Sequence, residues 1–115
     1  MSLGENPPEN PYRQYLIAAL GQALDNKEEV ADRVLDQGEI GDEDGKTQES
    51  AVTVKAPNSV VAILLCKAWL LRYYPDARGS RSSLSPGGKL YDHYIFSQPV
   101  KGATEIWFDL RLTDM

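Results

Sequence analysis

The stretch that decides the fold of this 115-residue chain is residues 60–74, which read VVAILLCKAWLLRYY. Residues 60–71 are apolar throughout except for Lys67. A run of 12 residues is too short to cross a bilayer, which takes about 20, so it predicts a buried helix that Pro75 ends. Because its apolar side chains point in every direction, other elements must cover it on several sides.

Two amphipathic segments precede this helix. Residues 11–25 place apolar side chains at helical spacing, and Asn10 is a good residue for capping the start. Residues 27–37 repeat the pattern and stop before Gly38, a common helix end. The spacing also runs on from one segment to the next, so one long helix stays open. We favour two helices or one kinked helix, preceded by a flexible arm over residues 1–10.

Three segments have the alternation typical of strands. Residues 51–56 alternate valine with polar side chains and predict a short strand. Residues 90–96 and 104–112 predict two longer strands joined by a turn over residues 98–102. The alternation is cleanest in the last segment, where apolar and polar side chains take turns along the whole length.

These elements predict an α+β domain with the order helix, helix, strand, helix, strand, strand. We expect a small antiparallel sheet whose C-terminal hairpin packs on the central helix, with the N-terminal helices on the other side of that helix. Residues 1–115 form a single domain in this prediction. Residues 39–50 and 76–89 are rich in glycine, serine and charge, so we expect exposed loops there. Sheet order cannot be derived.

Composition argues for an intracellular protein without bound metal. Cys66 is the only cysteine, so no intrachain disulfide can form, and a cytoplasmic location is expected. We see no signal peptide and no membrane segment, and expect no membrane partner. One cysteine and one histidine cannot build a structural zinc site. An EF-hand alignment of the acidic loop places Ile40 and Ala51 at ligand positions, so neither a metal nor a cofactor is expected.

Charge is divided unevenly along the chain. The net charge is −5, but residues 1–50 carry 4 basic and 12 acidic side chains, whereas residues 51–115 carry 8 basic and 5 acidic ones. Overall acidity disfavours a nucleic-acid partner, although the basic second half weakens that argument. Either the charges are simply solvated, or an acidic face binds a basic partner.

The outer face of the predicted hairpin is a candidate binding surface. A turn near Val100 places Trp107 opposite His93 and Asp109 opposite Tyr91. Aromatic residues ringed by charge are typical of binding patches. The alternative is that a helix covers this face as part of the fold. The predicted binding residues are Tyr91, His93, Ile95, Trp107, Asp109 and Arg111.

A basic, serine-rich segment is a second candidate, for anions. Arginine forks bind phosphate or carboxylate, and serine hydroxyls can complete a cradle. The alternative is a mobile loop without a ligand. The candidate residues are Arg72, Arg78, Ser80, Arg81 and Lys89.

Catalytic arrangements have little support in the sequence. Cys66 lies within the apolar helix, where thiols are usually inert. Asp92 and His93 are strand neighbours that point to opposite faces, so they are not expected to pair. His93 alone could act as a general base, but we name no catalytic residue and favour a non-catalytic role.

We therefore expect a small soluble protein-interaction or regulatory module that binds non-covalently to another protein or to a second copy of itself. One alternative is a small-molecule, anion-binding or catalytic domain that uses His93 and the Arg78/Arg81 segment. Another alternative is an acidic protein that neutralises a basic or nucleic-acid-binding partner.

Overall fold

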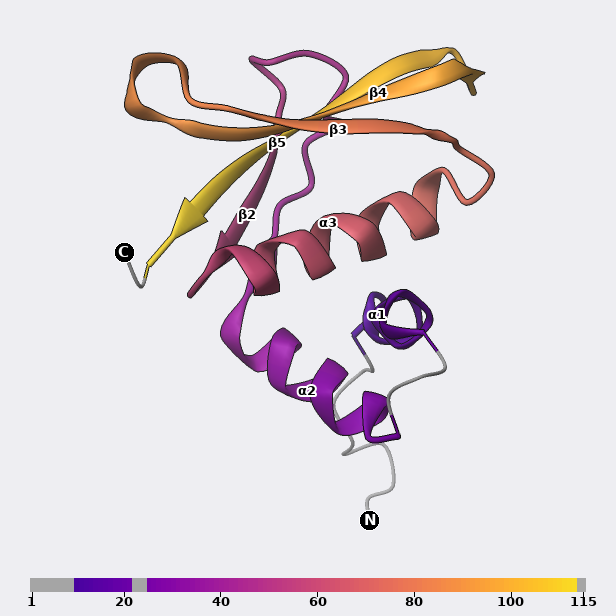
Figure 1. Ribbon diagram of the computed structural model, residues 1–115, viewed down its shortest axis with the longest axis vertical. Helices are drawn as coiled ribbons and strands as arrows, with labels where there is room; N and C mark the ends of the chain where they lie inside the picture. Colours follow the sequence, from indigo (N-terminus) through magenta and orange to yellow (C-terminus); the bar gives the residue numbers. More distant parts are fainter. Residues whose placement is uncertain (1–9, 22–24, 114–115) are drawn as a thin grey trace.

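The computed structural model describes residues 10–21 and 25–113, and these form three layers: a twisted sheet, a central helix and a pair of smaller helices (Figure 1). The expected arm over residues 1–10 lies almost entirely outside the described residues. The elements are α1 (Arg13–Leu20), α2 (Lys27–Gln37), β1 (Glu39–Ile40), β2 (Val52–Ala56), α3 (Ser59–Tyr73), β3 (Gly79–Leu84), the 3₁₀ turn η2 (Pro86–Gly88), β4 (Leu90–Val100) and β5 (Ala103–Leu112). The predicted α+β architecture is confirmed.

Helix α3 is the middle layer, as its composition predicts. Its start is capped by Asn58, whose Oδ1 accepts a hydrogen bond from the amide of Val61 at 3.0 Å. The sheet lies on one side of α3 and the pair α1 and α2 on the other (Figure 1). Its large apolar side chains are exposed only near the two ends, at Val60 (66%) and Tyr73 (39%). No helix among the described residues has the length and apolar character needed to cross a membrane.

The two N-terminal segments form separate helices. α1 ends at Leu20, and Gly21 leaves the helix with a φ of +76°, a conformation that glycine adopts without strain. α2 begins at Lys27 and runs across α1 rather than continuing it (Figure 1). An ion pair of 2.7 Å between Arg13 and Asp32 links the two helices. The structure thus excludes the single straight helix.

The sheet is larger than predicted and mixed in direction. It has five strands in the order β1-β2-β5-β4-β3. β2 and β5 run parallel, whereas all other neighbours are antiparallel. The predicted antiparallel hairpin is present, but the small antiparallel sheet expected around it is a larger, mixed sheet. The reason is topological: α3 carries the chain from β2 to the far edge, and the hairpin then returns β5 to the side of β2.

Both predicted loops contain strands. Residues 76–89 are exposed as expected, but residues 79–84 form β3 along the edge of β4. Gly79 makes close pairing possible there, because a Cβ at this position would lie 2.0 Å from the carbonyl oxygen of Ile95. Residues 39–50 begin with the two-residue strand β1 and continue as an exposed loop that is anchored at Gly45. We call residues 41–51 the acidic loop.

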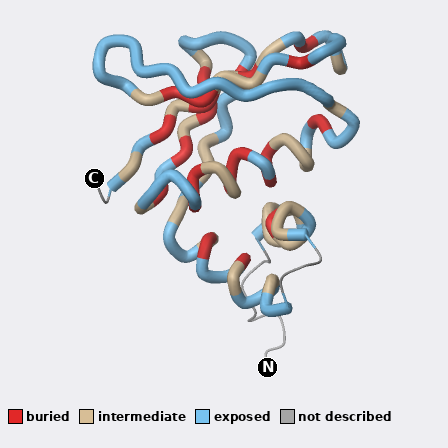
Figure 2. Tube along the Cα trace, viewed as in Figure 1, coloured by how far each residue is buried: buried red, intermediate tan, exposed pale blue. Residues whose placement is uncertain are grey.

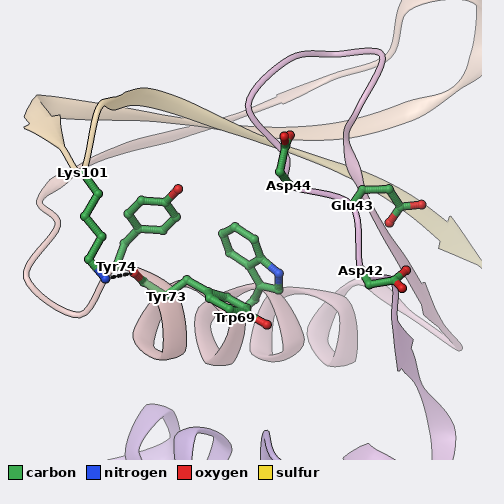
Figure 3. Close-up of a pocket in the computed structure, with 7 residues that line it drawn as sticks. All are labelled: Asp42, Glu43, Asp44, Trp69, Tyr73, Tyr74 and Lys101. Atoms are coloured by element: carbon green, nitrogen blue, oxygen red, sulfur yellow. Dashed lines mark hydrogen bonds between the residues drawn. The ribbon is translucent and has the colours of Figure 1, made fainter.

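The β4–β5 hairpin turns at Lys101 and Gly102, which both have positive φ angles (52° and 80°), as a tight two-residue turn requires. The Lys101 ammonium donates a hydrogen bond of 2.8 Å to the carbonyl of Tyr73, at the end of α3 (Figure 3). β4 extends to Val100, beyond the predicted end at Phe96. The hairpin is thus tied to the helix that it covers.

The two faces of the sheet have different surroundings. On the side of α3, which we call the covered face, Ile106, Phe108 and Leu110 of β5 are buried, and Figure 2 shows buried positions along both the sheet and α3. The ring of Trp69 from α3 packs edge-on against Phe108, with centroids 5.5 Å apart. No helix of the described residues lies over the opposite side, which we call the open face (Figure 1). The hydrophobic core therefore fills the space between the sheet and α3, and it continues on the other side of α3, where Leu16, Ala31 and Val34 are buried.

Candidate functional site

The six residues predicted to line the outer face of the hairpin belong to the open face. Ile106 and Phe108 are buried on the covered face, so the residues between and beside them point the other way. The pairing of His93 with Trp107 and of Tyr91 with Asp109 is confirmed. The open face thus receives Tyr91, His93 and Ile95 from β4, and Trp107, Asp109 and Arg111 from β5.

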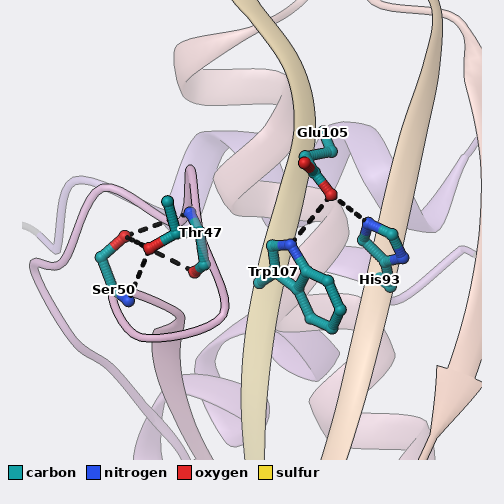
Figure 4. Close-up of polar contacts among 5 residues, drawn as sticks. All are labelled: Thr47, Ser50, His93, Glu105 and Trp107. Atoms are coloured by element: carbon teal, nitrogen blue, oxygen red, sulfur yellow. Dashed lines mark hydrogen bonds and ion pairs between the residues drawn. The ribbon is translucent and has the colours of Figure 1, made fainter.

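A stacked pair of rings marks the middle of the open face. His93 and Trp107 stack with centroids 3.9 Å apart and an interplanar angle of 15°. Glu105 holds both rings, because its Oε1 lies 2.6 Å from Nε2 of His93 and accepts a bond of 3.0 Å from Nε1 of Trp107 (Figure 4). Sequence reasoning missed the role of Glu105, although it precedes Trp107 by two positions on the same side of the strand.

Backbone hydrogen bonding explains why these rings come so close. The amide of Trp107 donates to the carbonyl of Gly45 in the acidic loop (2.7 Å) and therefore points away from β4. His93 and Trp107 thus form a non-hydrogen-bonded pair, the kind in which side chains of antiparallel strands approach most closely. Gly45 has a φ of +71°, and a Cβ there would lie 3.0 Å from Ile106, so this position favours glycine.

Tyr91 and the acidic loop border a polar hollow beside the stacked rings. Tyr91 is buried, with its ring edge-on to Trp107 at 5.9 Å. The hollow has a volume of about 500 Å³. Asp109 and Arg111 line it and form an ion pair with a distance of 3.5 Å. Its other lining residues include Glu49, Thr53, Lys89 and Tyr91.

The acidic loop is ordered by its own acids. Oδ1 of Asp44 accepts hydrogen bonds from the Lys46 amide (2.9 Å) and the Ser50 hydroxyl (2.8 Å). The hydroxyls of Thr47 and Ser50 lie 2.9 Å apart (Figure 4). These bonds, the one from the Lys46 amide first, lower the pKa of Asp44. The loop is therefore solvated, as predicted, but it has a defined shape.

β3 forms an exposed border of the open face. All six of its residues are exposed. Ser80, Ser82 and Leu84 lie opposite Ile95, His93 and Tyr91, and so share the open face with them. Leu84 and Ile95 are 38% and 46% exposed. They are the large apolar side chains that this border leaves accessible.

The pairing pattern also shows which backbone groups of β3 face outward. The amide of Ser97 donates to the carbonyl of Arg78 at 2.7 Å, so these two residues form a hydrogen-bonded pair. Alternation along the ladder directs the backbone groups of Ser80, Ser82 and Leu84 toward β4. The amides and carbonyls of Gly79, Arg81 and Ser83 therefore point away from the sheet.

A buried carboxylate lies on the covered face of the same strands. Asp92 is 1% exposed and is bonded to Arg81 (2.9 Å) and to the Ser83 hydroxyl (3.1 Å). Asp92 and His93 face opposite sides of the sheet, as predicted from their positions. Arg81 is thus committed to an internal carboxylate.

The predicted anion-binding residues do not share one set of free groups. Arg72 lies over the rings of Tyr12 and Tyr73, at 4.9 and 5.0 Å from their centroids. Arg81 is paired with Asp92, and Ser80 faces the other side of β3. Arg78 and Lys89 are exposed near the two ends of β3. Whether they bind an anion stays a prediction.

Among the described residues, His93 has Glu105 as its one hydrogen-bonding side-chain partner. Its Nε2 is bound by Glu105, and no hydroxyl or thiol of the described residues is hydrogen-bonded to its ring. Cys66 is buried in α3, and burial raises the pKa of its thiol. Within residues 10–21 and 25–113, no three His, Cys, Asp or Glu side chains group as they would around a metal ion.

A second cavity, which the sequence did not predict, lies away from the open face at the end of α3. It has a volume of about 330 Å³ and joins aromatic rings of α3 to acids of the acidic loop (Figure 3). Residues 42–44 and 69–74 are far apart in the sequence. Only the tertiary fold brings them together, so no local spacing could have revealed this cavity.

The chain matches no protein-family model, no curated protein and no solved structure. Its site is therefore interpreted from geometry and chemistry.

Proposed function

We propose that this protein is a non-catalytic interaction module that binds a second copy of itself through the free edge of β3. The observation that supports this most directly is a six-residue strand, exposed along its full length, at the edge of the sheet. Its outward amides and carbonyls at Gly79, Arg81 and Ser83 are ready to pair with another strand.

The two edges of the sheet differ in how they are protected. Natural proteins guard sheet edges with very short strands, lysines, prolines or bulges. β1 is only two residues long, so it offers little template for pairing. β3 has the sequence GSRSSL, with neither lysine nor proline. Its one charge, Arg81, is paired with Asp92, so β3 is the edge suited to association.

Two-fold symmetry supports self-association because it makes two β3 strands antiparallel. A register centred on Ser82 places Arg81 opposite Ser83 of the second copy and so avoids placing two Arg81 side chains opposite each other. In this register Leu84 lies beside Ser80 of the second copy. The small Ser80 side chain has Ile95 as its neighbour on β4, so Leu84 and Ile95 of opposite copies cover each other.

The other functions that the sequence left open have less support. Catalysis or small-molecule binding at His93 must compete with Glu105, which occupies Nε2. An acidic protein that neutralises a basic partner needs free carboxylates. This chain offers fewer of them than the sequence suggested, because the Glu43 carboxylate accepts hydrogen bonds from Thr53.

Sedimentation velocity of the purified chain over a wide concentration range tests the proposal. Ser83→Pro removes an outward amide, and Ser83→Ala is its matched control because both substitutions lose the bond to Asp92. We expect wild type and Ser83→Ala to form dimers and Ser83→Pro to stay monomeric with unchanged circular dichroism. A wild-type monomer at every concentration, or equal association of the two variants, would contradict the proposal.

A further inference from the structure

We propose that the cavity between the acidic loop and the end of α3 binds an alkylammonium group. The cavity has no lining residue on the β3 edge and shares only Glu43 with the hollow on the open face, so this inference does not rest on the proposed self-association. The residues that line it are Asp42, Glu43, Asp44, Trp69, Tyr73, Tyr74 and Lys101 (Figure 3).

Three aromatic rings form one wall of the cavity. The Trp69 ring centroid lies 4.9 Å from that of Tyr73 and 5.8 Å from that of Tyr74. Phe108 packs edge-on against Trp69, and Phe96 lies 5.3 Å from Tyr74. Because these core phenylalanines pack against Trp69 and Tyr74, that part of the wall exists before any ligand arrives. Aromatic faces arranged in this way attract cations, above all alkylammonium groups.

Acidic residues of the acidic loop line the other side of the cavity. Asp42 is exposed and makes no ion pair or hydrogen bond within the described part of the chain. Asp44 uses only Oδ1 in its loop contacts, which leaves Oδ2 available. Glu43 lines the cavity but bonds to Thr53. These acids favour a cation over a neutral ligand.

Lys101 is the one basic residue among those that line the cavity, and its ammonium group lies beside the aromatic wall. Its ammonium donates to the carbonyl of Tyr73 and lies 5.8 Å from the ring centroid of Tyr74. The three acids outnumber this single ammonium, so the lining keeps a formal charge of −2. Lys101 also shows that an ammonium already sits beside one of these rings.

The indole nitrogen of Trp69 is an independent sign of a ligand. Trp69 is only 4% exposed, yet its Nε1 makes no hydrogen bond to any described residue. No fully buried polar side-chain atom of the described residues lacks a partner, so this nitrogen keeps some exposed surface, and Trp69 lines the cavity. Buried indoles usually donate to an acceptor. A ligand that carries an oxygen close to its ammonium nitrogen supplies that acceptor.

The expected ligand is thus a compact ammonium group with an oxygen acceptor a few bonds away. Two sources share the ammonium group: a small free quaternary amine such as choline, whose hydroxyl also supplies the nearby oxygen, and a lysine side chain of a protein, methylated or not, whose nearest oxygen is a backbone carbonyl. Choline and Nε-trimethyl-lysine represent the two sources, and 3,3-dimethylbutanol has the shape of choline without its charge.

Nitrogen-15 NMR of the indole groups offers a direct test, because the chain has two tryptophans and Trp107 serves as an internal reference. We expect choline or Nε-trimethyl-lysine to shift the indole signal of Trp69 and leave that of Trp107 in place. The cation should bind about tenfold more tightly than the uncharged analogue. A Trp69 signal that no cation moves, or equal binding of choline and 3,3-dimethylbutanol, would overturn the proposal.

Two variants that each remove one carboxylate distinguish cation binding at this cavity from a general effect of the protein's negative charge. Asp42→Asn removes a carboxylate of the lining, and Asp36→Asn removes an exposed carboxylate of α2. We expect about two- to fivefold weaker cation binding in Asp42→Asn and unchanged binding in Asp36→Asn. Equal affinities of the two variants would contradict the site. Tyr73→Leu, at a partly exposed wall residue, should weaken binding further with the fold intact by circular dichroism.

Discussion

The covered and open faces of the sheet are built from the same strands but have different roles. On β5, Ile106 and Phe108 are buried on the side of α3, whereas Trp107 between them stacks on His93 on the open face. The covered face is therefore a dry core that holds the fold together. The open face is an ordered surface of rings and charges that no helix of the described residues covers, although Tyr91 is buried within it. One alternating strand thus supplies both the core and a surface for binding.

The largest difference between the faces should appear when a ring is removed from the covered one. Phe108→Ala deletes a fully buried side chain that Trp69 packs against. Such a change costs about 3–5 kcal/mol in the free energy of unfolding. Urea denaturation followed by circular dichroism measures this cost. A cost below that of any open-face substitution would contradict the division into two faces.

Two aspartates provide a matched test of charge on the two faces. Asp92→Ala leaves Arg81 without its buried partner and should cost about 2–3 kcal/mol. Asp109→Ala breaks a partly exposed pair with Arg111 (3.5 Å) and should cost less than about 0.5 kcal/mol. Urea unfolding of both variants measures the two values. Similar costs would mean that the faces do not differ in burial as described.

Trp107→Ala tests whether the open face is part of the core. It removes the stack on His93 and the bond to Glu105, which together are worth about 1 kcal/mol at a partly exposed position. We expect a folded protein with a modestly lower thermal midpoint. A loss as large as that of Phe108→Ala would instead show that the open face is structurally essential.

The smallest expected effect concerns the acidic loop and depends on pH. Hydrogen bonds from the Thr53 amide, above all, lower the pKa of Glu43 below its ordinary value of 4.5. The ionised carboxylate therefore stabilises the fold above that pH, and this contribution is lost as the pH falls through the lowered pKa. Glu43→Gln should have a lower urea midpoint than wild type at neutral pH, and the difference should vanish in acid. A difference that grows on acidification would contradict this assignment.

Side-chain alternation made the hairpin and its register predictable. A two-residue period and a short turn near Val100 suffice to place Trp107 opposite His93. The buried helix was equally predictable, because an apolar run of that length is too short to span a membrane and must be buried in a small globular protein.

Pairing partners, in contrast, could not be derived from local pattern. The sequence GSRSSL has weak strand propensity, and β3 forms because β4 offers it an edge. β2 and β5 lie parallel to each other because α3 carries the chain to the far edge of the sheet before the hairpin returns it to β2. The cation cavity was missed for a similar reason, since Asp42 and Trp69 meet only in the folded protein.

Amide hydrogen exchange in β3 tests the proposed association most directly. The amides of Ser80, Ser82 and Leu84 point toward β4 and should exchange slowly at every protein concentration. The amides of Arg81 and Ser83 point outward, and pairing with a second copy predicts that they become protected as concentration rises. Fast exchange of these two amides at all concentrations would contradict the conclusion that the free edge of β3 is where this protein binds.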